Sequence, residues 1–164
     1  MSEQLAGDDE APPPATEPVP PTAVFRLVEV VEATVTLPAN HAVVELQEAE
    51  PPYRSLSLPI GLAEGVALSQ ALHKIPTPRP FTHELFTTVL ERFALDIVAV
   101  RLVGRTGGTY QAELDLRGPS GRAVLDCRPS DAMVLALRQL VAAPVLVDDR
   151  LLATDDDVVP MGPA

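Results

Sequence analysis

The segment that most constrains the fold is TYQAELDL (109–116), in which apolar and polar side chains alternate. Such alternation is typical of a strand with one buried and one solvated face. The loops GRTGG before it and RGPSG after it contain the glycines that tight turns need. The flanking runs DIVAVRLV (96–103) and RAVLD (122–126) also favour strands. Because short loops join neighbouring antiparallel strands, we expect a sheet built largely from hairpins.

The rest of the chain predicts three earlier strands, three helices and a short last strand. The strands are expected over 24–37, 41–48, 53–60 and 143–149, and the helices over 62–74, 81–93 and 131–140. Hairpins and helices in this order indicate a single compact α+β domain with three helices around a largely antiparallel or mixed sheet.

The two later helices begin with similar motifs. RPFTHEL (79–85) and RPSDAM (128–133) both place Arg-Pro before a hydroxyl residue and an acid. A repeat of this kind is what an internal duplication of the chain would produce. Within the helix expected over 81–93, Leu85, Val89 and Phe93 recur at the spacing of an apolar helix face.

Charge and proline content divide the chain into three parts. Residues 1–21 hold six prolines and five acids but no base, so we expect a disordered acidic tail. We expect the folded domain over 22–153 and a second disordered acidic tail over 154–164. The net charge is −11, but residues 22–147 carry thirteen acids against eleven bases, which leaves −2. A phosphate-rich ligand is therefore not excluded, although no basic stripe indicates one.

Cysteine usage and hydropathy indicate a cytoplasmic protein. The single cysteine, Cys127, cannot form an internal disulfide, which fits a reducing compartment. Its strand-like flanks favour a small buried hydrophobe over a nucleophile. No apolar run approaches the roughly 20 residues that span a bilayer, and residues 1–21 do not resemble a signal peptide. We therefore expect no membrane partner.

Familiar catalytic motifs are missing: the sequence contains no GxSxG, GxxxxGK[ST], HExxH or GxGxxG. What remains is a set of polar residues at the junctions between elements. They are Glu64, Arg79, Thr82, His83, Glu84, Asp126, Arg128, Ser130 and Asp131. Phosphodiester hydrolysis needs carboxylates that hold a metal or activate water, and cations that offset charge on the phosphate. This set contains both, and its hard carboxylate oxygens would select Mg²⁺ or Mn²⁺.

Helix capping explains part of this set without any chemistry. Thr82 and Ser130 are plausible N-caps, and Asp131 is a plausible first-turn acid. Asp126 and Arg128 would then form a local ion pair. Capping does not explain the Arg-Pro pair before each helix. Two arginines on proline-stiffened entries to helices form a plausible anion-binding corner.

Four longer motifs together resemble the bifunctional nuclease domain family of bacteria and plants. They are IGLAEGVAL (60–68), TPRPFTHEL (77–85), GGTYQAEL (107–114) and LDCRPSDAMVLAL (125–137), followed by PVLVDDRLL (144–152). They occur in the family's order over about residues 24–153. Glu84 stands where the family usually has Asp.

The resemblance implies a nuclease that acts on DNA and RNA and forms a homo-oligomer, with a dimer favoured. The implied catalytic residues are Glu64, His83, Asp126 and Asp131, and the implied substrate-binding residues are Arg79, Thr82, Arg128 and Ser130. Asp126 and Asp131 would hold the divalent cation, Mg²⁺ or Mn²⁺. The alternative is a non-catalytic oligomeric module that binds an anionic ligand or a protein partner.

Overall fold

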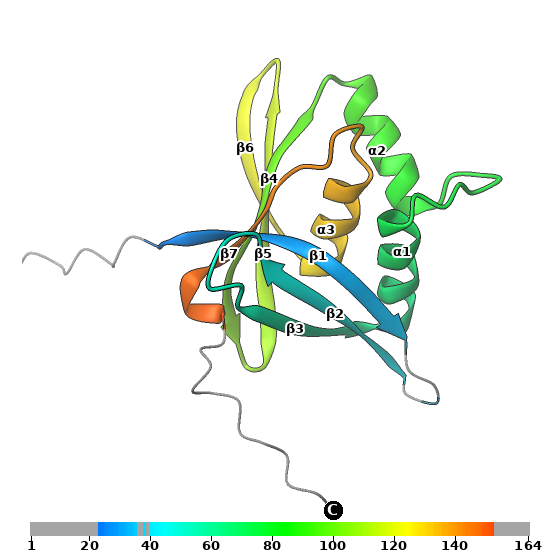
Figure 1. Ribbon diagram of the computed structural model, residues 1–164. Coiled ribbons are helices and arrows are strands. Elements are labelled where there is room, and N and C mark those ends of the chain that lie inside the picture. Colours follow the sequence, from blue (N-terminus) through cyan, green and yellow to red (C-terminus); the bar gives the residue numbers. More distant parts are fainter. Residues whose placement is uncertain (1–22, 36–37, 39, 153–164) are drawn as a thin grey trace, which may run out of the picture.

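The computed structural model describes residues 23–35, 38 and 40–152, and its centre is one seven-stranded sheet (Figure 1). The strand order is β3-β2-β1-β7-β4-β5-β6. The strands are β1 (Phe25–Val35), β2 (His41–Glu48), β3 (Ser55–Gly61), β4 (Asp96–Thr106), β5 (Thr109–Gly118), β6 (Gly121–Cys127) and β7 (Val145–Asp148). All neighbours pair antiparallel except β4 and β7, which pair parallel. The predicted α+β fold with a mixed sheet is therefore confirmed.

The sheet contains two antiparallel meanders on either side of β7. The first, β1-β2-β3, leads into α1 (Leu62–Leu72), and the second, β4-β5-β6, leads into α3 (Pro129–Leu137). Each meander is followed by a helix, so α1 and α3 occupy equivalent places in the two halves of the sheet. The repeated Arg-Pro motif, by contrast, stands before α2 (Thr82–Arg92) and α3. Glu64 and Asp131 are each the third residue of their helix, so the two meander–helix units place a carboxylate at equivalent positions. An internal duplication stays a prediction.

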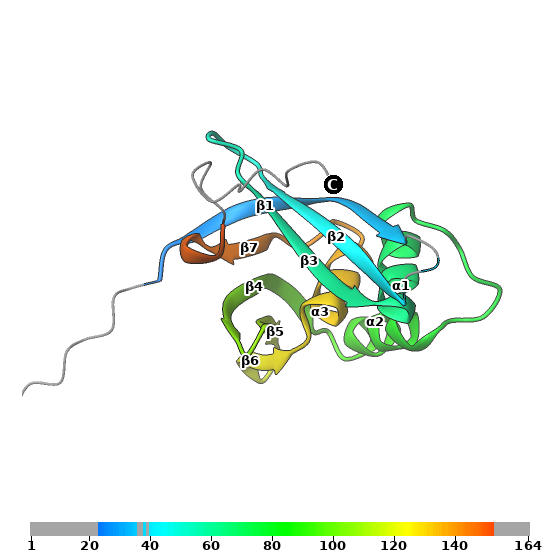
Figure 2. The same cartoon turned by 90° about the horizontal axis from the view of Figure 1, so that it is seen from below.

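The three helices lie together on one side of the sheet (Figures 1 and 2). α1 and α3 contact each other and the strands, while α2 contacts α3. Between helices and sheet lies a single apolar core. Its largest fully buried members are Leu46, Leu58, Leu68, Leu90, Leu102, Met133, Val44, Val100, Val134 and Val147. No helix among the described residues is long and apolar enough to cross a membrane.

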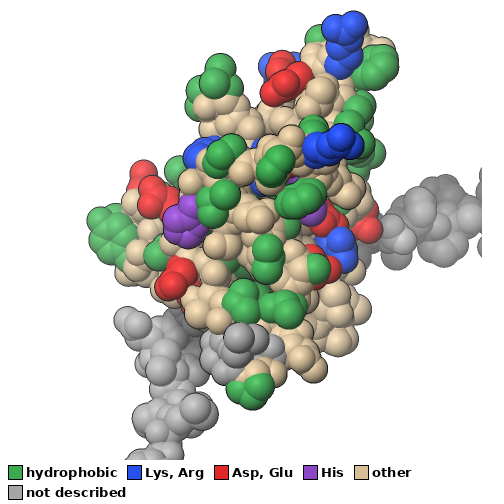
Figure 3. All heavy atoms as spheres, turned by 90° about the vertical axis from the view of Figure 1, so that its right-hand side faces the viewer, with side chains coloured by type: hydrophobic (Ala, Val, Ile, Leu, Met, Phe, Trp, Pro, Cys, Tyr) green, Lys and Arg blue, Asp and Glu red, His purple; other side chains and the backbone are tan. Residues whose placement is uncertain are grey.

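One face of α2 exposes apolar side chains. Leu85 is 57% exposed, Val89 40% and Phe93 66%, while the helix buries Thr87 and Leu90 instead. The apolar stripe found in the sequence therefore points away from the core. Figure 3, which views the molecule from the helical side, shows hydrophobic side chains spread across this surface between charged ones.

Both expected N-caps are wrong. α3 begins at Pro129, so Arg128 is its N-cap residue and Ser130 lies inside the first turn. Proline favours this first helical position because it lacks the N–H that would be unpaired there. α2 begins at Thr82, with Phe81 as N-cap. The backbone N–H of Phe81 donates to Glu84 Oε2 (2.8 Å), so the acid and not the threonine caps this helix.

Other expected boundaries move by a few residues. α3 ends at Leu137 and α1 at Leu72, earlier than expected, and β4 continues to Thr106, so that Gly107 and Gly108 alone make the turn. The tails expected over 1–21 and 154–164 lie outside the described residues.

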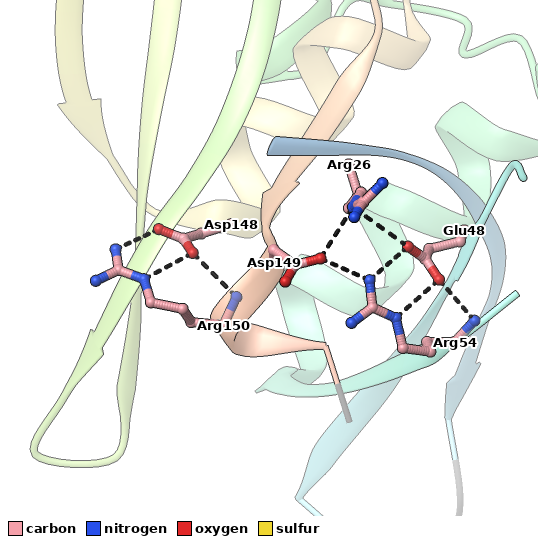
Figure 4. Close-up of polar contacts among 6 residues, drawn as sticks. All are labelled: Arg26, Glu48, Arg54, Asp148, Asp149 and Arg150. Carbon is pink, nitrogen blue, oxygen red and sulfur yellow. Dashed lines mark hydrogen bonds and ion pairs between the residues drawn. The ribbon is translucent and has the colours of Figure 1, made fainter. Parts of the chain in front are cut away.

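An ionic network ties the β2–β3 hairpin to the 3₁₀ turn η1 (Asp149–Leu151) (Figure 4). Glu48 accepts hydrogen bonds from the backbone N–H of Arg54 (3.0 Å) and from its Nε (3.0 Å) and Nη2 (2.8 Å). Arg54 Nη2 also donates to Asp149 Oδ1 (2.7 Å), which accepts from Arg26 Nε (2.9 Å) as well. The hydrogen bonds from Arg54 lower the pKa of Glu48 in spite of its burial.

Helix α1 approaches the sheet at Gly65, and we expect Gly65→Ala to destabilise the fold. An added Cβ would lie 2.3 Å from Cβ of Ala42, a fully buried residue of β2. Overpacking of this kind costs about 1–3 kcal/mol. Urea unfolding should show this loss, while Val66→Ala on the exposed side of α1 should stay within about 0.5 kcal/mol. An increase in stability, as alanine's helix propensity alone would give, would contradict this packing.

Candidate functional site

Arg128 joins the N-termini of α1 and α3. It follows β6 as the N-cap residue of α3, and its guanidinium donates from Nε to Asp131 Oδ2 (2.6 Å) and from Nη2 to Asp131 Oδ1 (3.0 Å). The remaining nitrogen, Nη1, donates to Glu64 Oε1 in α1 (2.7 Å). One guanidinium therefore bridges two carboxylates from the first turns of two helices. Its side chain is 65% exposed, so a ligand can reach it.

A glycine makes room for the Glu64 carboxylate. Gly61 is the N-cap residue of α1, and a Cβ built on it would lie 2.1 Å from Glu64 Oε2. The carboxylate thus occupies the space that a side chain at position 61 would fill. A larger residue there would displace Glu64 from Arg128, which gives a physical reason for the Gly-x-x-Glu spacing at this helix start.

His83 approaches the same carboxylate from α2. Its Nε2 lies 2.9 Å from Asp131 Oδ1. Burial raises the pKa of Asp131, but hydrogen bonds from Arg128 and His83 outweigh it, so the net pKa lies below the ordinary value. An ionised carboxylate only accepts hydrogen bonds, so Nε2 must carry a proton. In the neutral ring, Nδ1 then has a free lone pair.

Two hollows meet at Arg128. The first, the His83 hollow, has a volume of about 410 Å³ and is lined by Thr82, His83, Phe86, Arg128, Asp131 and Leu135. The second, the Tyr110 pocket, has a volume of about 220 Å³ and lies against the ends of β3 and the β4–β5 hairpin. Its lining includes Pro59, Ile60, Tyr110, Arg128 and Ser130. Arg128 lines both hollows, so it lies at the boundary between them.

Six of the eight site residues expected from the sequence lie at this cluster. Glu64, His83, Arg128 and Asp131 are linked by hydrogen bonds, and Thr82 and Ser130 line the two hollows.

The other two, Asp126 and Arg79, are exposed, and neither side chain forms a hydrogen bond or ion pair within the described part of the chain. The expected Asp126–Arg128 ion pair does not form, because Arg128 bonds Asp131 and Glu64 instead. Asp126, on β6, pairs with Glu113 of β5.

Glu84 is bound into the framework next to the site. Besides capping α2, it accepts hydrogen bonds from Thr77 in the connector and from Arg138 Nη1 at the end of α3 (2.8 Å). The hydrogen bond from Thr77 is the main cause of a lowered pKa of this carboxyl. Glu84 thus ties α2 to α3 and fixes the position from which His83 reaches Asp131.

Cys127 is not an activated nucleophile, as expected. The thiol is half-buried, donates to the carbonyl oxygen of Ala112 (Sγ to O, 3.7 Å) and has a pKa raised to about 11, chiefly by burial. Such a thiol is almost fully protonated near neutral pH.

Sequence reasoning missed the role of Tyr110. It is half-buried in β5, and it also lines the pocket beside Arg128. Its position two residues after the Gly107-Gly108 turn was the only signal, because the tip of a hairpin is able to reach a distant element.

The cluster in this arrangement does not fit a divalent cation. Both oxygens of Asp131 and one of Glu64 already accept hydrogen bonds from Arg128, and a cation beside the guanidinium would be repelled. Among the residues that the structure describes, no three His, Cys, Asp or Glu side chains form a group that could hold a metal ion. The expected Asp126–Asp131 metal pair has no support in this geometry.

Comparison with known proteins finds a matching family and similar curated proteins. Residues 44–159 match a family described as the bifunctional nuclease domain. Two curated proteins of Mycobacterium tuberculosis, named uncharacterized protein MT1877 (strain CDC 1551 / Oshkosh) and uncharacterized protein Rv1829 (strain ATCC 25618 / H37Rv), are each 32% identical over 133 residues. Each alignment covers 81% of this chain and 77% of the relative.

Proposed function

Because this chain belongs to the bifunctional nuclease domain family, we propose that it hydrolyses phosphodiester bonds of DNA or RNA at the Arg128 cluster. The observation that carries the proposal is the bridge from Arg128 to Glu64 and Asp131, beside His83. It combines an accessible cation, two helix N-termini and a histidine held by a carboxylate. Phosphoryl transfer requires charge stabilisation and positioning of this kind.

In this proposal, Arg128 binds a non-bridging oxygen of the scissile phosphate. The partial positive charges at the N-termini of α1 and α3 add to its field. This addition matters because Glu64 and Asp131 bring two negative charges against the single positive charge of Arg128. The carboxylates hold the guanidinium at the boundary of the two hollows before substrate binds. Binding therefore does not carry the entropic cost of ordering this side chain.

His83 is the proposed general base. Asp131 accepts the Nε2 proton and orients the ring, which leaves Nδ1 to take a proton from water in the His83 hollow. The water oxygen attacks phosphorus, and the bond between phosphorus and the leaving sugar oxygen breaks. That oxygen receives a proton from solvent. Asp131 is a positioning residue in this scheme, because it acts through His83.

The decisive experiment is incubation of the purified protein with labelled single-stranded DNA and RNA, in Mg²⁺ and in EDTA. We expect cleavage in both conditions, since the carboxylates are occupied by Arg128. His83→Ala should lower the rate about 100-fold, the usual contribution of a general base. Asp126→Asn serves as a test of the expected metal pair and should have little effect. Complete loss of cleavage in EDTA, or in Asp126→Asn, would contradict this mechanism.

A second candidate function, a non-catalytic oligomeric module that binds an anionic ligand or a protein partner, is favoured by one observation. The α2 face that includes Leu85, Val89 and Phe93 exposes apolar surface of the kind that protein contacts cover. Under this alternative, sizing would give a stable homo-oligomer, with a dimer favoured, and no cleavage would occur. We place either activity in the cytoplasm.

A further inference from the structure

The Tyr110 pocket is a separate cavity from the His83 hollow. Arg128 is the one residue that lines both hollows. A phosphate bound to its guanidinium would therefore place its ester substituents toward two different cavities. The water and the general base occupy one of them in the proposed mechanism, so the other is available to the attached nucleoside.

The lining of this pocket suits a flat, mostly apolar group with polar edges. Leu58, Pro59 and Ile60 supply apolar walls, and Tyr110 supplies an aromatic ring. Ser130 adds a polar group: the residue is only 4% exposed and lines the pocket, and its hydroxyl forms no hydrogen bond to another described residue. A hydroxyl both donates and accepts, so this one is a candidate hydrogen-bond partner for a ligand in the pocket.

One face of the Tyr110 ring is already occupied. The guanidinium of Arg105 lies 4.9 Å from the ring centroid, and Arg105 Nε donates to the carbonyl oxygen of Gly108 (3.3 Å). Arg105 does not line the Tyr110 pocket but lines a separate hollow with Gly104 and Gln111. Arg105 therefore covers one ring face and leaves the opposite face open to a ligand, and the cation holds the ring in place.

The volume limits what can enter. At about 220 Å³ the pocket is smaller than the roughly 300–1,000 Å³ of sites for drug-sized ligands. It fits one base and not a stacked pair. A base inside a duplex cannot reach such a pocket unless it leaves the stack, which costs a few kcal/mol.

We propose that the Tyr110 pocket is a nucleobase subsite, in which one unpaired base stacks on Tyr110 and bonds the Ser130 hydroxyl while its phosphate contacts Arg128. The protein therefore selects single-stranded nucleic acid. This inference rests on the proposed function for its choice of ligand, but it concerns binding and not hydrolysis.

The chain offers a direct reporter for this subsite, because it has two tyrosines and no tryptophan. In Tyr53→Phe, Tyr110 is the only tyrosine and therefore the only source of tyrosine emission. Combining this change with His83→Ala removes the proposed base, so that a single-stranded oligonucleotide can be titrated intact. We expect saturable quenching of Tyr110 emission by the single strand and by a nucleoside monophosphate, but not by deoxyribose phosphate or a blunt duplex.

Two matched variants complete the test. Tyr110→Phe in the His83→Ala background leaves only Tyr53, which is 54% exposed in the β2–β3 turn, and its emission should change only by absorption of light by the bases. Tyr110→Leu should weaken binding of the single strand about tenfold, as expected for the loss of one stacked base. Ser130→Ala should weaken binding by a smaller factor. The substitution removes only the hydroxyl oxygen, so helix α3 stays intact.

The outcomes separate this inference from the proposed function. Equal quenching by duplex and single strand, or unchanged affinity in both Tyr110→Leu and Ser130→Ala, would overturn the subsite even if the wild-type protein cleaves nucleic acid. Saturable, base-dependent quenching without any cleavage by the wild type would support the subsite and contradict the nuclease proposal.

Discussion

Arg128→Ala is expected to lower the rate of phosphodiester hydrolysis about 1,000-fold, the upper range for loss of one group that stabilises the transition state. The change removes the cation that binds the phosphate. It also leaves Glu64 and Asp131 without their shared partner, so that two negative charges face the incoming phosphate. The rate is measured with a labelled single strand under single-turnover conditions.

Two further arginine variants show whether this loss is specific. Arg128→Lys keeps the charge but cannot bridge two carboxylates in the same plane, so we expect an intermediate rate. Arg117→Ala removes another exposed arginine, from β5, whose side chain forms no hydrogen bond within the described residues, and should leave the rate unchanged. Arg128 is mostly exposed, so its removal should change the free energy of unfolding by no more than about 1 kcal/mol. A near-normal rate in Arg128→Ala would refute the proposed site.

Glu48→Ala is expected to lower the free energy of unfolding by about 3 kcal/mol or more, the usual result when one partner of a buried ion pair is removed. The Glu48 side chain is 4% exposed and that of Arg54 15%, so the remaining guanidinium would be buried without its carboxylate. Asp149 would compensate only in part, since it is also bonded to Arg26. Glu50→Ala, at an exposed position in the adjacent turn, should change stability by less than about 0.5 kcal/mol.

The same residue predicts how stability depends on pH. Hydrogen bonds from Arg54 hold the pKa of folded Glu48 below its ordinary value of 4.5. The stabilisation is therefore fully present above the unfolded pKa and is lost as the pH falls through the folded pKa. Denaturant unfolding from neutral to acidic pH should show that the difference between wild type and Glu48→Ala shrinks below about pH 4.5. A difference that stays constant with pH would contradict the ionised pair.

Much of the fold was predictable, because its signals are local. The alternation in TYQAELDL and the glycine turns around it predict the β4-β5-β6 meander, and the structure confirms it. The parallel pairing of β4 with β7 was not predictable from a local pattern, since the two strands pair only after α3 has returned the chain to the sheet. The exposed stripe on α2 shows the same limit. Its periodicity predicts a helix but not which face the rest of the molecule will cover.

The candidate site was also predictable only in part. The residue types were recognisable at the helix starts, because Arg-Pro, hydroxyl and acidic residues mark those junctions. Which of them meet was decided by packing. Glu64 and Arg128 are 64 positions apart, and they bond because α1 and α3 start side by side. Asp126 is two residues from Arg128, yet the two form no ion pair, because the Arg128 guanidinium bonds Asp131 and Glu64 instead.

The sequence by itself determined which segments form strands and which form helices, and it determined the family to which the chain belongs. These depend on side-chain periodicity and on short motifs, which act over a few residues. Only the tertiary structure decided that Arg128 bonds Glu64 and Asp131, that His83 joins them and that Tyr110 lines a pocket beside them. These contacts join α1, α2, α3 and the β4–β5 hairpin, and their geometry exists only after the core has placed those elements together.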